Sequence, residues 1–147
     1  MIRLRRAEAS DQRAIRRIII SARLDPTSLK WEHFMLAVDD AANNAIAGCA
    51  QIKRYADCDE FGSLVVLPAY RNRGIGGQLL RALVEAETRP VHLVCLEKMR
   101  PYYERFGFRL LPFAQSPRTL MLKQAFGRAF GARVICMKRA IAPTACA

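Results

Sequence analysis

Metal-binding and membrane-spanning patterns are missing from this chain of 147 residues. Its five cysteines form no Cys-x-x-Cys pair, and only two histidines are present to join them, so the spacing of a zinc site is absent. No apolar run approaches the ~20 residues that cross a bilayer. The triplet Ile18–Ile20 is too short and too closely preceded by charged residues to be the core of a signal peptide. We therefore expect no metal, no membrane span and a cytoplasmic location.

Acidic residues are few, and they are unevenly distributed. The chain has 24 Lys and Arg residues against 13 Asp and Glu residues, a formal net charge of +11. From Arg105 to Ala147 there are eight basic residues and no acidic one. Such a surplus suits a polyanion, a membrane surface or a smaller ligand with several phosphates. The chain lacks an exposed run of aromatic residues interleaved with basic ones, so nucleic acid is not the expected partner.

Internal repeats and linkers are also missing. The length and a hydrophobic content of 52% suit one folded domain with one substantial core. We expect that domain to span residues 1–139, followed by a C-terminal tail at 140–147.

Two common glycine-rich phosphate-binding patterns fail. A P-loop needs a Gly-Lys pair, and the chain has none. A dinucleotide-binding fingerprint needs a third glycine where Leu79 stands. What is present is a predicted strand, residues 60–67, then Pro68, and then a basic loop with three glycines at 71–77. The first N–H groups of the helix that follows lack partners inside it, and glycines let an anion approach them. The segment is therefore expected to bind a phosphate or pyrophosphate.

Apolar periodicity predicts alternating strands and helices. Strands are expected at 1–5, 34–38, 45–55, 60–67, 91–96, 108–111 and 132–137. Helices are expected after Ser10, which is placed to cap the first of them, then from residue 75, at 99–106 and at 117–130. This order belongs to the α/β (α+β) class and implies a mixed sheet with helices on both faces.

Two motifs resemble the signatures of the GNAT superfamily of acetyl-CoA-dependent N-acyltransferases. The first is Arg-x-x-Gly-x-Gly at residues 71–76, and the second is Tyr-Tyr-Glu-Arg-Phe-Gly-Phe at residues 102–108. The resemblance covers residues 1–137. It implies the GNAT fold, a mixed and mostly antiparallel sheet of six to seven strands with helices on both faces. It also implies acetyl-CoA as the co-substrate.

The resemblance assigns roles to particular residues. The strand residues Leu64, Val65 and Val66 would offer backbone groups to the pantetheine arm. The pyrophosphate would be bound by the loop and the start of the helix: Arg71, Asn72, Arg73, Gly74, Ile75, Gly76 and Gly77. Tyr103 would lie near the thioester sulfur.

Acyl transfer to an amine sets its own requirements. The amine must lose a proton before its lone pair attacks, the carbonyl oxygen must be stabilised, and the leaving thiolate benefits from a proton. Tyr103 is the expected general acid, the alternative being that both tyrosines only pack. Glu60 is the expected general base; Asp57 or Asp59 could replace it, and a merely solvated acidic turn is the alternative to all three.

We interpret the chain as an N-acetyltransferase that moves an acetyl group to a primary amine by direct attack in a ternary complex. The alternative is a catalytically weak CoA-binding sensor or scaffold. The sequence does not identify the acceptor, although the basic surface favours an acidic one. The helix at 117–130 departs from the simplest family pattern: it is interpreted as a core-packing helix, with an acceptor-site cap, an acidic partner or a homodimer as alternatives.

Overall fold

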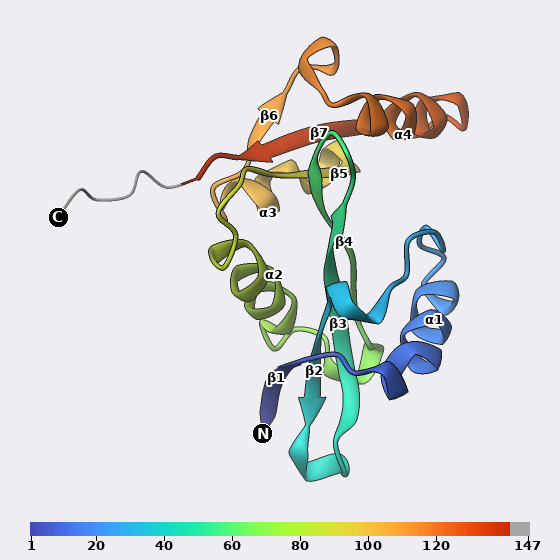
Figure 1. Ribbon diagram of the computed structural model, residues 1–147, viewed down its shortest axis with the longest axis vertical. Coiled ribbons are helices and arrows are strands. Elements are labelled where there is room, and N and C mark those ends of the chain that lie inside the picture. Colours follow the sequence, from blue (N-terminus) through green and yellow to red (C-terminus); the bar gives the residue numbers. More distant parts are fainter. Residues whose placement is uncertain (142–147) are drawn as a thin grey trace, which may run out of the picture. The chain divides into compact units, whose positions relative to one another are not determined.

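The computed structural model describes residues 1–141. Seven strands form a mixed sheet in the order β1-β2-β3-β4-β5-β7-β6 (Figure 1). The strands are β1 (Ile2–Arg6), β2 (Phe34–Asp39), β3 (Ala45–Arg54), β4 (Asp59–Val66), β5 (Val91–Leu96), β6 (Arg109–Leu111) and β7 (Val134–Arg139). The helices are α1 (Gln12–Ser21), α2 (Ile75–Glu85), α3 (Arg100–Glu104) and α4 (Arg118–Ala129). From residue 142 onward, the predicted tail lies outside the described residues.

The chain divides into two compact units. The first comprises Met1–Lys53 and Phe61–Glu85, and the second comprises Arg54–Glu60 and the chain from Ala86 onward. The single-domain interpretation therefore stays a prediction, and each unit is described by itself.

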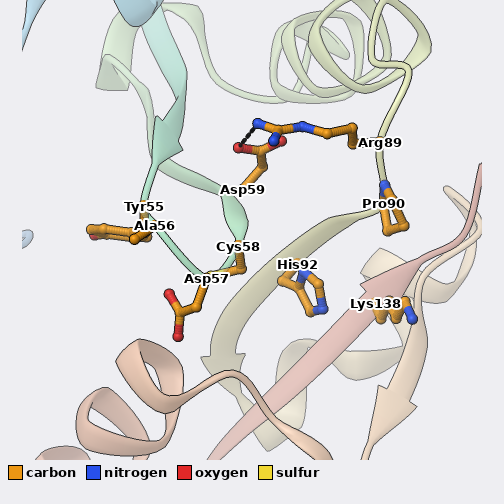
Figure 2. Close-up of a pocket in the computed structure, with 9 residues that line it drawn as sticks. All are labelled: Tyr55, Ala56, Asp57, Cys58, Asp59, Arg89, Pro90, His92 and Lys138. Carbon is orange, nitrogen blue, oxygen red and sulfur yellow. Dashed lines mark hydrogen bonds and ion pairs between the residues drawn. The ribbon is translucent and has the colours of Figure 1, made fainter.

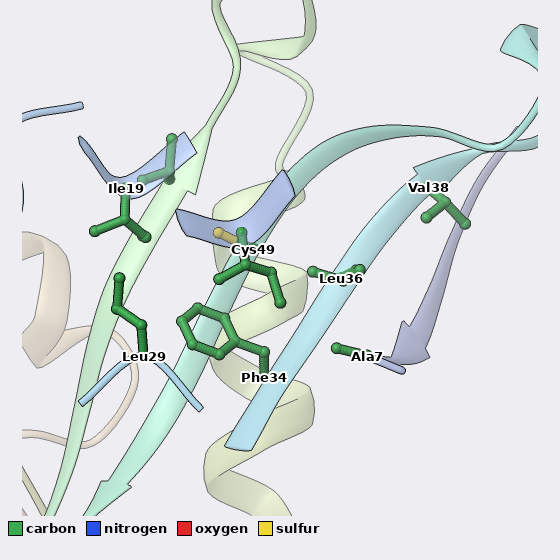
Figure 3. Close-up of a cluster of buried hydrophobic side chains, with 9 residues drawn as sticks. Ala7, Ile19, Leu29, Phe34, Leu36, Val38 and Cys49 are labelled. Carbon is green, nitrogen blue, oxygen red and sulfur yellow. The ribbon is translucent and has the colours of Figure 1, made fainter. Parts of the chain in front are cut away.

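In the first unit, α1 and α2 cover opposite faces of the strands (Figure 1). Ile15 and Ile19 of α1 are fully buried in a cluster that includes Phe34 and Leu36 of β2 and Cys49 of β3 (Figure 3). The buried residues of α2 are Ile75, Leu79, Leu80, Leu83 and Val84. They follow the predicted helical spacing, so burial of this stripe anchors the helix that follows the glycine-rich loop.

The start of the first helix differs from the prediction. Ser10 lies inside a short 3-10 turn, Ala9–Asp11, and does not cap α1. Asp11 instead accepts hydrogen bonds from the Glu8 N–H at 2.8 Å and from the Arg5 guanidinium at 2.7 Å. Glu8 and Asp11 form a capping box, in which each side chain accepts a hydrogen bond from the backbone N–H of the other. Arg5 binds the Asp11 carboxylate of this box, a contact that helix-capping preferences do not consider.

Gly48 marks a close approach of β3 to β4. A Cβ atom at this position would lie 2.7 Å from the Val65 carbonyl oxygen. We expect Gly48→Ala to lower the free energy of unfolding by about 1–3 kcal/mol, since the backbone must shift to admit the methyl group. Urea unfolding followed by circular dichroism measures the change. Gly131→Ala is the contrast, because that site has open space and only a positive φ of 80°; a larger loss there than at Gly48 would contradict the steric argument.

The second unit is built on β5, β7 and β6. β5 pairs antiparallel with β7, and β6 pairs antiparallel with β7. The start of β4 joins β5 in parallel, with Asp59 opposite Val91 and Glu60 opposite His92. The chain between β6 and β7 forms α4, which confirms the helix predicted at 117–130.

Candidate functional site

The glycine-rich loop connects β4 to α2 in the first unit. After β4 the chain makes a 3-10 turn at Pro68–Tyr70, and the backbone φ is positive at Asn72 (62°) and Gly74 (74°). Gln78 N–H donates to the Gly74 carbonyl at 3.1 Å, the first hydrogen bond of the helix. The N–H groups of residues 75–77 therefore have no acceptor inside α2, and no side chain is present at positions 76 and 77 to cover them. This is the geometry expected of an anion site.

Two arginines of the loop are tied to its backbone. Arg71 Nε donates to the Val66 carbonyl at 3.1 Å, and Arg73 Nη2 donates to the Ala69 carbonyl at 3.2 Å. Arg73 also lies over the Tyr70 ring, 5.5 Å from its centroid. Both arginines are exposed and use only part of their N–H groups in these bonds. They hold positive charge beside the open end of α2 and have donors left for a phosphate.

The strand before the loop is distorted, which the sequence did not indicate. Ser63 has a φ of 56° in the middle of β4, a conformation that costs energy for a residue with a side chain. Its hydroxyl accepts a hydrogen bond from Gln51 Nε2 at 2.8 Å. The predicted cofactor residues Leu64, Val65 and Val66 follow at once. Because the Val65 side chain is buried in the core, only backbone groups of this residue are available to a ligand.

Tyr103 lies on the short helix α3 in the second unit. Its ring meets Tyr102 edge-on at 5.1 Å and Phe108 at 6.2 Å between centroids. Within residues 1–141, the Tyr103 hydroxyl has no hydrogen-bond partner. Burial raises the pKa of Tyr103, so the phenol keeps its proton at neutral pH. Aromatic contacts thus hold the Tyr103 ring in place, and its hydroxyl can donate a hydrogen bond to a ligand.

Glu60 is buried at the start of β4, only 4% exposed. Its Oε1 accepts a hydrogen bond from Lys123 Nζ of α4 at 2.9 Å. Its Oε2 is buried and has no hydrogen-bond partner among the described residues. Burial alone would lower the pKa of Lys123, but the Glu60 charge and the hydrogen bonds of Glu60 and Tyr55 outweigh burial, and the pKa is raised. Glu60 is therefore a paired carboxylate with one oxygen left for a ligand.

The two alternative bases, Asp57 and Asp59, already bind other side chains. Asp59 forms ion pairs with Arg89 at 2.9 Å and with Arg54 at 3.2 Å. Asp57 accepts hydrogen bonds from the Thr119 N–H at 3.0 Å and hydroxyl at 2.8 Å, which hold the pKa of Asp57 below its usual value. Both carboxylates therefore anchor parts of the second unit, whereas Glu60 keeps one carboxylate oxygen without a partner among the described residues.

A cavity of about 270 Å³ lies beside this segment in the second unit (Figure 2). His92 and Cys58 line it together with the two committed aspartates. Burial and then the charge of Lys138 lower the pKa of His92, so the imidazole is neutral at pH 7. The His92 Nδ1 is buried without a hydrogen-bond partner in the described part of the chain.

The four cysteine thiols of the described residues are poor nucleophiles. Burial, with a further contribution from the charge of Asp57, raises the pKa of Cys58 to about 12. Burial also raises the pKa of Cys49 to about 12 and those of Cys95 and Cys136 to about 11. Such thiols hold almost no thiolate at neutral pH.

We therefore expect Cys58→Ser to keep its turnover within about twofold, because no step needs a thiolate. The measurement is the rate of acceptor-dependent thiol release at pH 7.5. Treatment of the unmodified chain with iodoacetamide at that pH is the chemical counterpart, and rapid labelling of Cys58 with loss of turnover would contradict the expectation.

Lys123 is the functional candidate that sequence reasoning missed. It lies 63 positions from Glu60 in the chain, and in the sequence it is one of several basic residues on a helix. No spacing rule connects the two residues. The apolar periodicity at 117–130 predicts a helix with basic residues, but it does not identify the carboxylate that any of them binds.

A comparison with known families gives a match to this chain. The family described as acetyltransferase (GNAT) domain matches residues 30–110, a range that holds the distorted strand, the glycine-rich loop and Tyr103. A comparison with curated protein sequences finds no match.

Solved structures match over most of the chain. N-acetylglutamate synthase from Neisseria gonorrhoeae, complexed with coenzyme A and N-acetyl-glutamate, matches with a TM-score of 0.76 at 19% identity, over 97% of this chain but 35% of that chain. The Rv2747 protein of Mycobacterium tuberculosis, in complex with CoA and NLQ, matches with a TM-score of 0.74 at 18% identity, over 95% of this chain and 99% of that chain. Arabidopsis thaliana NAA60, in complex with a bisubstrate analogue, matches with a TM-score of 0.67 at 18% identity, over 96% of this chain and 98% of that chain.

At these identities the matches show a shared fold, and the predicted GNAT fold is confirmed. Within residues 1–141, no helix has the length and apolarity that a bilayer span requires. The same residues contain no group of three or more His, Cys, Asp or Glu side chains placed to hold a metal ion.

Proposed function

This chain belongs to the GNAT acetyltransferase family, and from that premise we propose that it transfers an acetyl group from acetyl-CoA to a primary amine by direct attack in a ternary complex. The observation that carries the proposal is the glycine-rich start of α2, whose open N–H groups are flanked by two exposed arginines. Backbone donors of this kind recognise a pyrophosphate without reading a base or a sugar.

Ten residues form the proposed binding segment for the co-substrate. The N–H groups at the start of α2 and the side chains of Arg71 and Arg73 bind its phosphates, while the positive φ of Asn72 and Gly74 turns the loop. Backbone groups of Leu64, Val65 and Val66 bind the pantetheine arm. One of these N–H groups stabilises the carbonyl oxygen as negative charge develops on it.

Proton transfers are assigned to two side chains. Glu60 Oε2 takes a proton from the incoming ammonium, directly or through a water, which frees the lone pair for attack on the thioester carbonyl carbon. The new C–N bond forms and the C–S bond breaks. The Tyr103 hydroxyl donates a hydrogen bond and then its proton to the leaving sulfur, and it recovers a proton from the amine nitrogen. The proton taken from the amine nitrogen replaces the one given to sulfur. This replacement is needed because a phenol with a raised pKa is a weaker acid than the thiol that it protonates.

For the acceptor we propose an amine that also carries a carboxylate, such as a free amino acid. The net charge of +11 favours an anionic acceptor. Two of the similar structures are described with N-acetyl-glutamate and NLQ bound, and these are ligands of those proteins. A protein with acidic stretches at its amine is the second candidate, favoured by the same charge.

Thiol release with a panel of acceptors tests the function. Acetyl-CoA and the purified chain are incubated with glutamate, glutamine, lysine, a simple alkylamine, and peptides with acidic or neutral N-termini. Thiol release that depends on an amino acid supports the proposed acceptor. Thiol release that depends only on acidic peptides indicates that the acceptor is a protein. Tight CoA binding without acceptor-dependent release from any of them would replace the enzyme with a sensor or scaffold.

Lys123 provides a pH-dependent test of the proposed base. We expect the acid limb of the kcat/KM profile to move to higher pH in Lys123→Met, because a buried carboxylate that loses its counter-charge binds a proton more readily. Lys123→Arg should restore the original limb, and Glu60→Gln should lower turnover throughout the range. An unchanged profile in Lys123→Met, with folding intact by circular dichroism, would remove Glu60 from the proton transfer.

A further inference from the structure

Helix α4 turns apolar side chains outward. Leu122, Phe126 and Phe130 are 72%, 69% and 77% exposed. Spaced four residues apart, they lie on one side of the helix, and the rings of Phe126 and Phe130 are 4.8 Å apart between centroids. Ala125 and Ala129 are exposed between them. We call the surface formed by Leu122, Ala125, Phe126, Ala129 and Phe130 the α4 ridge.

The opposite side of α4 is already occupied within the second unit. Leu120 and Gln124 are buried there. Thr119 binds Asp57, and Lys123 binds Glu60. The buried side chains and these hydrogen bonds therefore anchor α4 in the unit and leave Leu122, Phe126 and Phe130 exposed, whereas an ordinary surface helix exposes polar residues. The core-packing interpretation of this helix is correct for its inner side and leaves the ridge unexplained.

The surroundings of the α4 ridge are positively charged. Arg118 and Arg128 are exposed on the same helix, and Arg128 lies 5.1 Å over the centroid of the partly exposed Phe113 ring. The helix has no acidic residue, and none occurs between Arg105 and the end of the chain. A ligand for this surface must cover apolar area and supply negative charge at its border.

We propose that the α4 ridge binds an acidic amphipathic helical segment of another protein. Apolar side chains of the partner at helical spacing would pack on Leu122, Phe126 and Phe130, and its Asp or Glu residues would pair with Arg118 and Arg128. This interaction is separate from acetyl transfer and does not depend on the proposed function.

A second copy of the chain fits this surface poorly. Packing α4 against α4 would bring arginines together with no acidic residue of the segment to pair with them, and such like-charge contacts are costly. The ridge also presents on the order of 400 Å² of apolar surface, about half of the ~800 Å² that a stable interface buries on each partner. Charge and area both favour a transient contact with a short segment.

A designed helical peptide tests the proposal. The probe is a fluorescein-labelled 18-residue peptide with Leu at i, i+3, i+4 and i+7, Glu at the positions that border them, and Ala elsewhere to favour the helix. One control peptide keeps Glu but replaces Leu by Gln, and a second keeps Leu but replaces Glu by Lys. Fluorescence anisotropy with the full chain is expected to show saturable binding of the probe, at least tenfold tighter than that of either control.

Matched variants locate the binding. Phe126→Ser is expected to weaken probe binding tenfold or more and to leave acetyl transfer unchanged. Ile20→Ser removes another exposed apolar residue, 57% exposed in α1, and should leave probe binding unchanged. Equal binding of the Gln control peptide, or no effect of Phe126→Ser, would reduce the interaction to general charge attraction and overturn the proposal.

Two further results would overturn it in favour of another occupant. A dimer in sedimentation equilibrium that Phe126→Ser dissociates would assign the ridge to a second copy. Binding to vesicles containing phosphatidylserine, lost in Phe126→Ser, without binding of the probe would assign it to a lipid surface.

Discussion

Gly76→Glu is expected to weaken CoA binding at least about 100-fold, a loss of about 2.8 kcal/mol. Gly76 is the second residue of α2, where N–H groups without partners are proposed to meet the pyrophosphate. A carboxylate at this position covers the backbone and repels the phosphates. Isothermal titration calorimetry with CoA measures the change in affinity.

The same substitution is expected to leave the fold intact. Glutamate is a better helix former than glycine, and a negative charge in the first turn stabilises a helix. Loss of binding would therefore not be explained by unfolding. Gly76→Ala separates bulk from charge, and Gln78→Glu places the same charge two residues further along α2. Unchanged affinity in Gly76→Glu would exclude this loop as the phosphate site.

Tyr103→Phe is expected to lower kcat by roughly 100-fold, the lower range for loss of a proton-transfer group. The ring contacts of Tyr103 with Tyr102 and Phe108 are kept in phenylalanine. Since no described residue accepts a hydrogen bond from the hydroxyl, its removal leaves no buried group unpaired. CoA affinity should therefore stay within about twofold while turnover falls.

The neighbouring tyrosine is the control for this prediction. Tyr102 lies on the same short helix and packs on Phe106 at 5.3 Å between centroids. Tyr102→Phe should turn over at the original rate. If Tyr103→Phe were as active as the unmodified chain, or if the two substitutions had the same effect, the hydroxyl of Tyr103 would have no part in the reaction.

The sequence by itself determined the family, the mixed sheet and the position of the glycine-rich loop. These follow from local patterns: β-branched residues at 65–66 favour a strand, glycines at 74, 76 and 77 leave the helix start open, and apolar spacing buries one side of α2. Each pattern lies within a few residues, so no knowledge of distant neighbours is needed.

Only the tertiary structure decided which charges meet. It paired Glu60 with Lys123, bound Asp57 to Thr119, and committed Asp59 to Arg54 and Arg89. It also turned Leu122 and Phe126 outward, although their sequence allows either side of α4 to be buried. The physical reason is that these contacts join residues as many as 63 positions apart. Such contacts depend on how β4, β5 and β7 align and on how α4 packs in the second unit, and hydrophobic periodicity specifies neither.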